Sequence, residues 1–248
     1  MNLSEFFEEN PKAALAFSGG VDSAYLLYAA KAAGADVRAY YVKSDFQPLF
    51  ELEDAKRMCG ELEIGFTILK LDVLADRTVR ENPADRCYRC KKLIFTTIQK
   101  AAAADGYELL LDGTNASDEE GDRPGMRALQ EMAVRSPLRE CGLTKKEIRR
   151  LSEAAGLFTW EKPAYACLAT RIPTGEEITV EKLKATEAAE DFLFSRGFTD
   201  FRVRRFGGAA RLQFPAAQLA RAFAEREEIV KELKQYYQAV LLDMEVRI

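Results

Sequence analysis

The sequence predicts an α/β protein in which a parallel sheet carries helices on both faces, followed by a small α+β domain. In the first half of the chain, short apolar runs alternate with segments of helical length and periodicity, the pattern of βαβ units. After residue 178 the order changes to helix, strand, strand, helix, strand, which favours an antiparallel sheet. We therefore expect two domains, residues 1–170 and residues 171–248.

The first domain begins with an apolar run at 12–17, a predicted buried strand, and a helical pattern at 21–33. The alternation continues through strands at 36–44, 66–73 and 107–115 and helices at 48–63 and 87–106. Parallel strands end at a shared edge of the sheet, where ligands of such folds bind. Two polar segments are expected at that edge: SGGVDS (18–23), which follows a predicted strand, and DGTN (112–115), which ends another.

The later part of the chain begins with a polar loop after residue 116 that leads into a short helix. A further helix is predicted at 144–157, where Thr144 and Glu147 form a capping box. Residues 158–177 have little periodicity and are predicted to be a functional loop or linker. The predicted elements that follow are helices at 179–196 and 216–237 and strands at 198–206, 210–214 and 239–246.

The composition narrows the function classes. The chain has 248 residues, 48% of them hydrophobic and 31% charged, with a net charge of −4, so we expect no nucleic-acid partner. No apolar run approaches the ~18 residues that span a bilayer, and the start lacks a positively charged leader, so we expect a cytoplasmic protein. Histidine is absent, which removes the commonest general base and nitrogen ligand, and the five cysteines are expected to be reduced.

The SGGVDS segment has the residues of an anion-binding loop. Gly19 and Gly20 let backbone amides approach a ligand closely, Ser18 and Ser23 add hydroxyl donors, and the following helix presents its positive end. A tight turn capped by Asp22 or Ser23 is the alternative. The Walker lysine is missing, and the segment resembles the PP-loop of the ATP pyrophosphatase superfamily. This resemblance implies that ATP is cleaved to pyrophosphate and an adenylated substrate, with Mg²⁺ associated with Asp22.

Four further segments resemble the LarE family in order and spacing across nearly the whole chain. They are CYRCKK (87–92), DGTNASDEEGDRPGMRA (112–128), WEKPAYACLATRIPTGEEIT (160–179) and RVRRFGGAARLQF (202–214). The resemblance implies adenylation of a carboxylate of pyridinium-3,5-biscarboxylic acid mononucleotide and its conversion to a thiocarboxylate. That product belongs to the biosynthesis of the nickel-pincer cofactor of lactate racemase. The resemblance also implies a homo-oligomer, a hexamer in the family.

Several charged residues are candidates for binding the substrate. Lys91 matches an active-site lysine of the family, and an ammonium group there suits a phosphate or carboxylate. Arg202 and Arg204 alternate on a predicted strand, share a face and suit a phosphate monoester, as they do by the resemblance. Asp118 and Arg123 follow DGTN, where they are candidates for contacts with Mg²⁺, nucleotide or substrate. The alternative interpretation is solvated surface charge for Lys91, Asp118 and Arg123, and an edge strand protected by charge for Arg202 and Arg204.

The cysteines bear on the source of sulfur. Cys167 matches the functional cysteine of the family, which in some members gives up its own sulfur, whereas Cys59 and Cys141 are interpreted as structural. Cys87 and Cys90 form a CxxC pair, which by its residues alone fits a redox dithiol, part of a zinc site or iron–sulfur ligation. The resemblance implies a 4Fe–4S cluster on Cys87, Cys90 and Cys167, with one corner left open for an extra sulfide.

Other functions remain compatible with the PP-loop. The first is a PP-loop enzyme that thiolates tRNA, against which the acidic composition argues. A nucleotide-binding sensor without turnover is the second. An amide-forming synthetase is the third, although no glutaminase domain is recognisable. Within the LarE resemblance, sacrifice of the Cys167 sulfur is the alternative to a cluster.

Overall fold

The computed structural model describes residues 1–118 and 124–247 and divides into two compact units. The first comprises Met1–Val73 and Asp85–Lys162, and the second comprises Leu74–Ala84 and Pro163–Ile248. The second unit thus takes in two segments, 74–84 and 163–170, that the division at residue 170 assigned to the first domain. In the part of the chain that is described, no helix is long and apolar enough to cross a bilayer.

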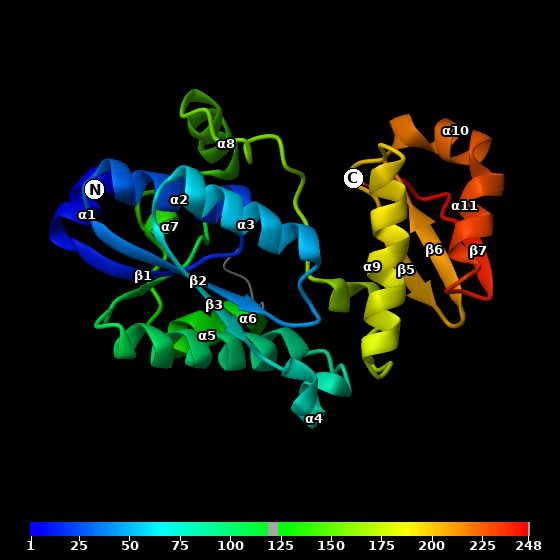
Figure 1. Cartoon of the computed structure of the whole chain (residues 1–248), viewed down its shortest axis with the longest axis horizontal. Coiled ribbons are helices and arrows are strands. Elements are labelled where there is room, and N and C mark those ends of the chain that lie inside the picture. Colours follow the sequence, from blue (N-terminus) through cyan, green and yellow to red (C-terminus); the bar gives the residue numbers. More distant parts are fainter. Residues whose placement is uncertain (119–123, 248) are drawn as a thin grey trace. The chain divides into compact units, whose positions relative to one another are not determined.

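The first unit is built on a four-stranded parallel sheet in the order β3–β2–β1–β4 (Figure 1). Its strands are β1 (Lys12–Ala16), β2 (Asp36–Lys43), β3 (Gly65–Lys70) and β4 (Leu110–Leu111). This confirms the predicted parallel α/β fold. The last strand is much shorter than the predicted 107–115. After Leu111 the side chain of Asp112 accepts hydrogen bonds from the Thr114 amide and hydroxyl, and such local bonds compete with strand pairing.

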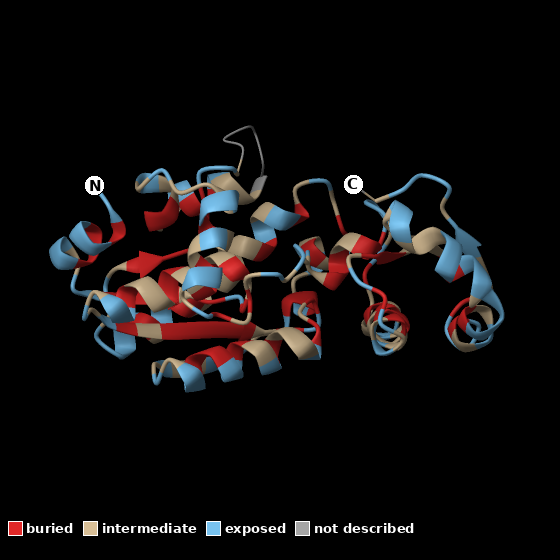
Figure 2. Ribbon diagram, turned by 90° about the horizontal axis from the view of Figure 1, so that it is seen from above, coloured by how far each residue is buried: buried red, intermediate tan, exposed pale blue. Residues whose placement is uncertain are grey.

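Helices cover both faces of this sheet, as predicted (Figure 1). One face carries α1 (Leu3–Glu9), α2 (Val21–Ala32), α3 (Leu49–Glu61), α7 (Pro137–Glu140) and α8 (Lys145–Ala154), and the other carries α5 (Arg86–Ala104) and α6 (Pro124–Glu131). Neighbouring residues of β1 show the alternation: Leu15 joins the core under α2 and α3, and Ala14 the core under α5. Figure 2 shows the strands buried between helices whose outer sides are exposed.

Helix α1 was not predicted from the sequence. Asn2 Oδ1 accepts a hydrogen bond from the Glu5 amide at 3.0 Å, and Glu5 Oε2 accepts one from the Asn2 amide at 2.9 Å. This reciprocal pair is a capping box, and Phe6 and Phe7 anchor the short helix in the core. The Asn-x-x-Glu spacing was the available signal. The box predicted at Thr144 and Glu147 is confirmed at the start of α8.

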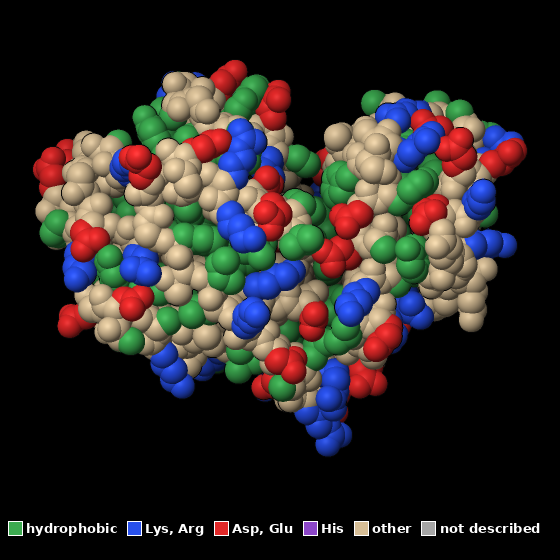
Figure 3. Space-filling view, viewed as in Figure 1, with side chains coloured by type: hydrophobic (Ala, Val, Ile, Leu, Met, Phe, Trp, Pro, Cys, Tyr) green, Lys and Arg blue, Asp and Glu red, His purple; other side chains and the backbone are tan. Residues whose placement is uncertain are grey.

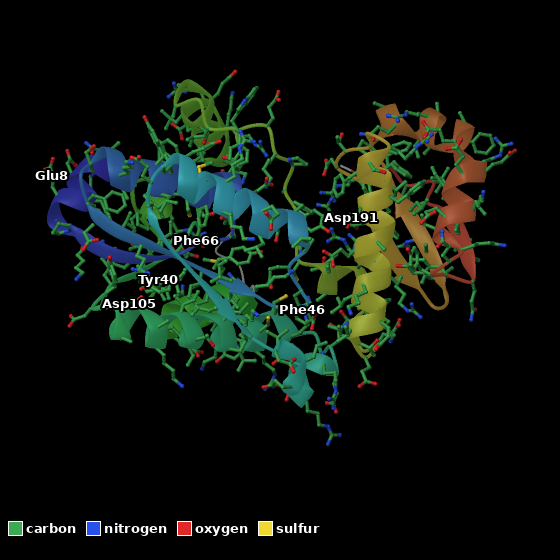
Figure 4. All side chains as sticks on the ribbon, in the orientation of Figure 1. Glu8, Tyr40, Phe46, Phe66, Asp105 and Asp191 are labelled. Carbon is green, nitrogen blue, oxygen red and sulfur yellow. The ribbon has the colours of Figure 1, made fainter. Side chains whose placement is uncertain are left out.

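A buried tyrosine ties β2 to the end of α5. Tyr40 is fully buried, and its hydroxyl donates a 2.8 Å hydrogen bond to Asp105 Oδ2, at the C-terminal cap of the helix (Figure 4). Burial, with this hydrogen bond, raises the pKa of Tyr40. The phenol therefore stays a neutral donor, which satisfies a polar group inside an otherwise apolar layer.

The second unit is a small α+β unit with a three-stranded sheet in the order β5–β6–β7. Its elements are α9 (Val180–Ser195), β5 (Arg202–Phe206), β6 (Ala209–Gln213), α10 (Ala216–Ala224), α11 (Arg226–Leu233) and β7 (Ala239–Leu242). The short elements 3-10 helix Val73–Ala75, α4 (Arg77–Arg80) and 3-10 helix Leu168–Arg171 complete the described chain.

The predicted antiparallel sheet is only partly correct. β5 and β6 form an antiparallel hairpin, but β6 and β7 are parallel. The reason is the connection, because helices α10 and α11 carry the chain back along the sheet before β7 begins, as a crossover between parallel strands requires. The single helix expected at 216–237 is also divided, with Glu225 between its two parts.

Candidate functional site

The SGGVDS loop lies between β1 and α2 and is closed by its two serines. Ser18 Oγ and Ser23 Oγ are 3.1 Å apart, and Ser23 Oγ also donates to Gly20 O at 3.2 Å. Ser18 Oγ in turn accepts a 3.4 Å hydrogen bond from the Gly20 amide. Gly20 is the N-cap of α2, so the amides of the first helical turn follow the loop directly. This arrangement can bind an anion such as pyrophosphate.

Glycines are required at two points around this loop. Gly19 has φ +76°, and a Cβ there would lie 3.0 Å from Glu51 O. A Cβ on Gly113, in the DGTN segment, would lie 3.0 Å from the Ser23 amide nitrogen. The structure therefore brings SGGVDS and DGTN into direct backbone contact at one edge of the sheet, where the sequence placed them.

Asp22 is a carboxylate with only part of its charge compensated. Its Oδ2 accepts a 2.5 Å hydrogen bond from Lys145 Nζ, whereas Oδ1 is buried and has no hydrogen-bond partner among the described residues. Burial raises the pKa of Asp22, and the charge of Asp118 adds to the increase, although Lys145 opposes it. An orphaned carboxylate oxygen in such a setting fits a Mg²⁺ ligand.

Two lysines that the sequence analysis did not single out supply positive charge at the loop. Lys145, the first residue of α8, pairs with Asp22. Lys162 Nζ donates to Gly19 O at 3.3 Å and forms an ion pair with Asp54. A lysine in the first turn of a helix opposes the helix dipole, and this was the available signal for Lys145.

Two other predicted binding residues of the first unit are described: Lys91 packs against Gly125, and Asp118 contacts the DGTN segment. A Cβ on Gly125 would lie 3.1 Å from Lys91 Cδ and Cε and 3.3 Å from Lys91 Nζ, so glycine at this position leaves room for the Lys91 side chain. Asp118 Oδ2 accepts a 2.9 Å hydrogen bond from the Asn115 amide. Arg123, a predicted contact of the nucleotide or substrate, lies outside the described residues.

The CxxC pair lies on the first turns of α5. Cys87 is exposed and Cys90 is buried, and residues three apart on a helix are neighbours on its surface. Arg86 Nη2 donates to Cys87 Sγ at 3.4 Å. Cys59 and Cys141 instead belong to the core on the opposite face of the sheet, and burial raises the pKa of Cys59 to about 12. Such a thiol is unreactive, in agreement with a structural role for Cys59.

The predicted metal ligands come from both units of the described chain. Within residues 1–118 and 124–247, no three or more Cys, Asp or Glu side chains are grouped as metal ligands. Cys87 and Cys90 belong to the first unit and Cys167 to the second. A cluster on these three cysteines therefore stays a prediction.

In the second unit, Cys167 caps the short helix Leu168–Arg171 and is half-buried. Beside it, Arg171 Nε donates a 2.8 Å hydrogen bond to Glu190 Oε1, and each of these side chains is only 1% exposed. Burial alone would lower the pKa of Arg171, but the hydrogen bonds and charge of Glu190 outweigh it, and the pKa is raised. Arg171 and Glu190 thus form a buried ion pair inside the second unit.

Arg202 and Arg204 point toward the segment that contains Cys167. Arg202 Nη2 donates to Ala164 O, and Arg204 Nη1 donates to Thr170 O at 3.0 Å. The two arginines are two residues apart on β5 and so share a face of the strand, as predicted, and both reach this segment.

Arg202 and Arg204 have other arginines as neighbours, so positive charge exceeds negative charge around them. Burial, followed by the charges of Arg171 and Arg247, lowers the pKa of Arg202 to about 10. Burial and neighbouring arginines lower the pKa of Arg204 as well. Each remains protonated at neutral pH, so a bound anion would relieve the repulsion between them.

Comparisons with known proteins agree with this geometry. The family model of the queuosine biosynthesis protein QueC matches residues 12–82, which include the SGGVDS loop. An uncharacterised protein of Synechocystis is 39% identical over 88% of this chain and 82% of its own length. A tRNA-specific 2-thiouridylase of Clostridium botulinum is 26% identical over 60% of this chain, which spans about half of that relative (51%).

One characterised relative covers nearly the whole chain. The pyridinium-3,5-bisthiocarboxylic acid mononucleotide synthase of Lactiplantibacillus plantarum is 32% identical over 93% of this chain and 84% of its own length. A match of this length takes in most of both units. The chain belongs to the LarE family of ATP-dependent sulfur transferases.

Proposed function

We propose that the protein adenylates a carboxylate of pyridinium-3,5-biscarboxylic acid mononucleotide, releases pyrophosphate and replaces AMP with sulfur to form a thiocarboxylate. Such a product is a precursor of the nickel-pincer cofactor of lactate racemase. The observation that carries the proposal is the anion-binding SGGVDS loop, in which Asp22 Oδ1 is buried and has no hydrogen-bond partner within residues 1–118 and 124–247. Adenylation is needed because a carboxylate oxygen is a poor leaving group until it is esterified with AMP.

At the nucleotide end, Ser18, Gly19, Gly20 and Ser23 hold the departing pyrophosphate through amides and hydroxyls. Asp22 would hold Mg²⁺, which when bound neutralises phosphate charge. Lys145 forms an ion pair with Asp22. We expect this ion pair to separate when ATP and Mg²⁺ bind. Asp22 would then bind Mg²⁺, and Lys145 would bind phosphate.

At the substrate end, Arg202 and Arg204 bind the phosphate of the mononucleotide, supported by their surplus of positive charge. Lys91 neutralises charge on the reacting carboxylate or the α-phosphate. Asp118 and Arg123 contribute contacts from the loop after DGTN. In this proposal the predicted domain 1–170 is the ATP pyrophosphatase domain, apart from segments 74–84 and 163–170, which belong to the second unit. The second unit, with the predicted domain 171–248, serves substrate binding and oligomerisation.

For the sulfur source we propose a 4Fe–4S cluster held by Cys87, Cys90 and Cys167. Two observations support cluster ligation: Cys87 and Cys90 lie three residues apart on one helical turn, and Arg86 Nη2 donates a hydrogen bond to Cys87 Sγ. A cluster with three cysteine ligands leaves one iron open and would supply a sulfide for transfer. The chain's own task is to keep these thiolates available and to hold the activated substrate.

The alternative is sacrifice of Cys167. Its Sγ would attack the acyl carbonyl and displace AMP, giving a thioester. Loss of the Cys167 Cα proton and cleavage of its Cβ–Sγ bond would then release the thiocarboxylate and leave dehydroalanine. Each chain would turn over once, and its mass would fall by one H₂S.

The test is a pyrophosphate-release assay with ATP and the biscarboxylate mononucleotide, before and after anaerobic reconstitution with iron and sulfide. We expect substrate-dependent pyrophosphate release in both samples and repeated sulfur transfer only after reconstitution. If no pyrophosphate is released, the proposed adenylation is wrong and the alternative of a nucleotide-binding sensor without turnover is favoured. Stimulation by bulk tRNA would favour tRNA thiolation instead. On the face shown in Figure 3, Lys and Arg are interspersed with Asp and Glu, and such a mixed surface does not favour a nucleic-acid backbone.

Replacing Lys145 tests the nucleotide end. Lys145→Met is expected to raise the KM for ATP about tenfold to a hundredfold, the range for a lost charged hydrogen bond. The matched control is Lys146→Met, because Lys146 is the next residue of α8 and is exposed. A KM for ATP that is equal in the two variants would exclude Lys145 from phosphate binding.

We further propose a cytoplasmic homo-oligomer, a hexamer as the family resemblance implies. The second unit exposes large apolar side chains that suit contacts between copies, namely Phe206, Phe223, Leu241, Leu242 and Met244. Light scattering coupled to size-exclusion chromatography measures the number of chains.

A further inference from the structure

Both carbonyl groups that flank Cys167 are held by hydrogen bonds. Arg171 Nη1 donates to Ala166 O at 3.0 Å, on the N-terminal side of Cys167. On the other side, Thr170 Oγ1 donates to Cys167 O at 2.8 Å and accepts a 2.8 Å hydrogen bond from Arg171 Nη1. One guanidinium group therefore holds the backbone on both sides of Cys167, once directly and once through a hydroxyl.

The guanidinium is itself held by the Glu190 carboxylate, which accepts four hydrogen bonds. Glu190 accepts from Arg171 Nε at 2.8 Å, from Arg171 Nη2 at 3.2 Å and from the Tyr165 hydroxyl at 2.5 Å. It also accepts from the Val203 amide at 2.9 Å, which ties it to β5. A planar, forked cation paired in this way has a defined orientation, unlike a flexible surface ion pair.

The ends of the segment 164–170, which we call the Cys167 segment, are held by the two arginines assigned to the substrate phosphate. Arg202 contacts its first carbonyl, Ala164 O, and Arg204 contacts its last, Thr170 O. A phosphate bound to Arg202 and Arg204 would compete for these donors. The Cys167 segment would then adjust when the phosphate binds.

We propose that Thr170, Arg171 and Glu190 are positioning residues for Cys167, and that Arg202 and Arg204 link the position of Cys167 to binding of the substrate phosphate. The first part stands whether Cys167 ligates iron or gives up its own sulfur, because either role requires the thiol at a defined place. The second part rests on the proposed function. A device of this kind favours sulfur transfer only when a substrate with its phosphate is bound.

Thr170→Val separates positioning from stability. It removes the hydroxyl between Arg171 and Cys167 O but keeps the buried Arg171–Glu190 pair. On the full chain, treated with a chelator, we expect iodoacetamide to alkylate Cys167 about threefold to tenfold faster than in the wild type, the range for one net hydrogen bond. Peptide mass spectrometry measures the rate at Cys167 alone.

Two further variants make this result specific. Thr170→Ser keeps the hydroxyl and is expected to retain the wild-type rate, as is Thr174→Val, which makes the same substitution at an exposed residue nearby. Equal rates in Thr170→Val and Thr170→Ser overturn the positioning role. Tyr165→Phe, which removes one hydrogen bond to Glu190 but keeps the ring, is expected to raise the rate as well, so a folding defect in Thr170→Val does not prevent the test.

Inorganic phosphate is the probe for the second part. We expect saturating phosphate to change the alkylation rate of Cys167 about threefold in the wild type, because one hydrogen bond to the segment is exchanged. The effect should disappear in Arg204→Gln, which lacks the donor to Thr170 O. A wild-type rate that does not respond to phosphate overturns the link. Neither measurement uses ATP or turnover, so the pyrophosphate-release assay reports failure of the proposed function separately.

Discussion

Cys167→Ala is expected to abolish thiocarboxylate formation, by at least about a thousandfold, the scale on which loss of a reacting group acts. Pyrophosphate release should continue, because the SGGVDS loop, Asp22 and Lys145 belong to the first unit and Cys167 to the second. Measuring pyrophosphate and thiocarboxylate in the same reaction separates the two steps. Simultaneous loss of both products would mean that Cys167 is required for adenylation, contrary to its proposed role.

The CxxC pair decides between the two sulfur sources. With a cluster, Cys87→Ala combined with Cys90→Ala removes sulfur transfer as completely as Cys167→Ala. With a sacrificed Cys167, the double variant still transfers sulfur once and loses one H₂S from its mass. Cys141→Ala is the matched control, since Cys141 packs against the core on the other face of the sheet.

Gly113→Ala is expected to reduce pyrophosphate release about tenfold to a hundredfold. The new methyl group would lie 3.0 Å from the Ser23 amide nitrogen and 3.2 Å from Ser23 Cα, so the two loops must separate. Forced overpacking of this kind lowers stability by about 1–3 kcal/mol, and here the displaced atoms belong to the pyrophosphate loop itself. The rate of pyrophosphate release and the midpoint of urea unfolding are the two measurements.

Gly60→Ala provides the control for that substitution. Gly60 lies in α3, and a Cβ there would meet no heavy atom within 4 Å. Alanine favours a helix over glycine, so we expect unchanged activity and stability that is equal or up to about 1 kcal/mol higher. Wild-type pyrophosphate release in Gly113→Ala would show that the contact with Ser23 is not needed for catalysis.

Local periodicity was sufficient for most of the elements. β1, α2, β2, α3 and α9 lie within one or two residues of their predicted ranges, because alternation of apolar residues records which face is buried. The predicted strand pairing was wrong where it depends on residues that are distant in the sequence. β7 pairs parallel to β6 rather than antiparallel, and this depends on the path of α10 and α11 and not on the residues of β7.

The chemistry of the site divides in the same way. Motifs of adjacent residues, such as SGGVDS and the CxxC pair, are legible in the sequence because one loop or one helical turn suffices to arrange them. Lys145 and Lys162 were not found, since their relevance arises from contacts with Asp22 and Gly19 across more than a hundred residues of chain.

The parallel α/β architecture, the anion-binding loop and the CxxC pair were thus contained in the residue order, since each rests on short-range spacing, whereas the assignment of Cys167 came from the family resemblance. Only the tertiary structure shows which charges compensate one another. Burial leaves one Asp22 oxygen without a hydrogen-bond partner among the residues that the structure describes, and Arg171 pairs with Glu190 next to the segment that contains Cys167. These depend on desolvation and on hydrogen-bond geometry. Both properties belong to side chains brought together from distant parts of the chain.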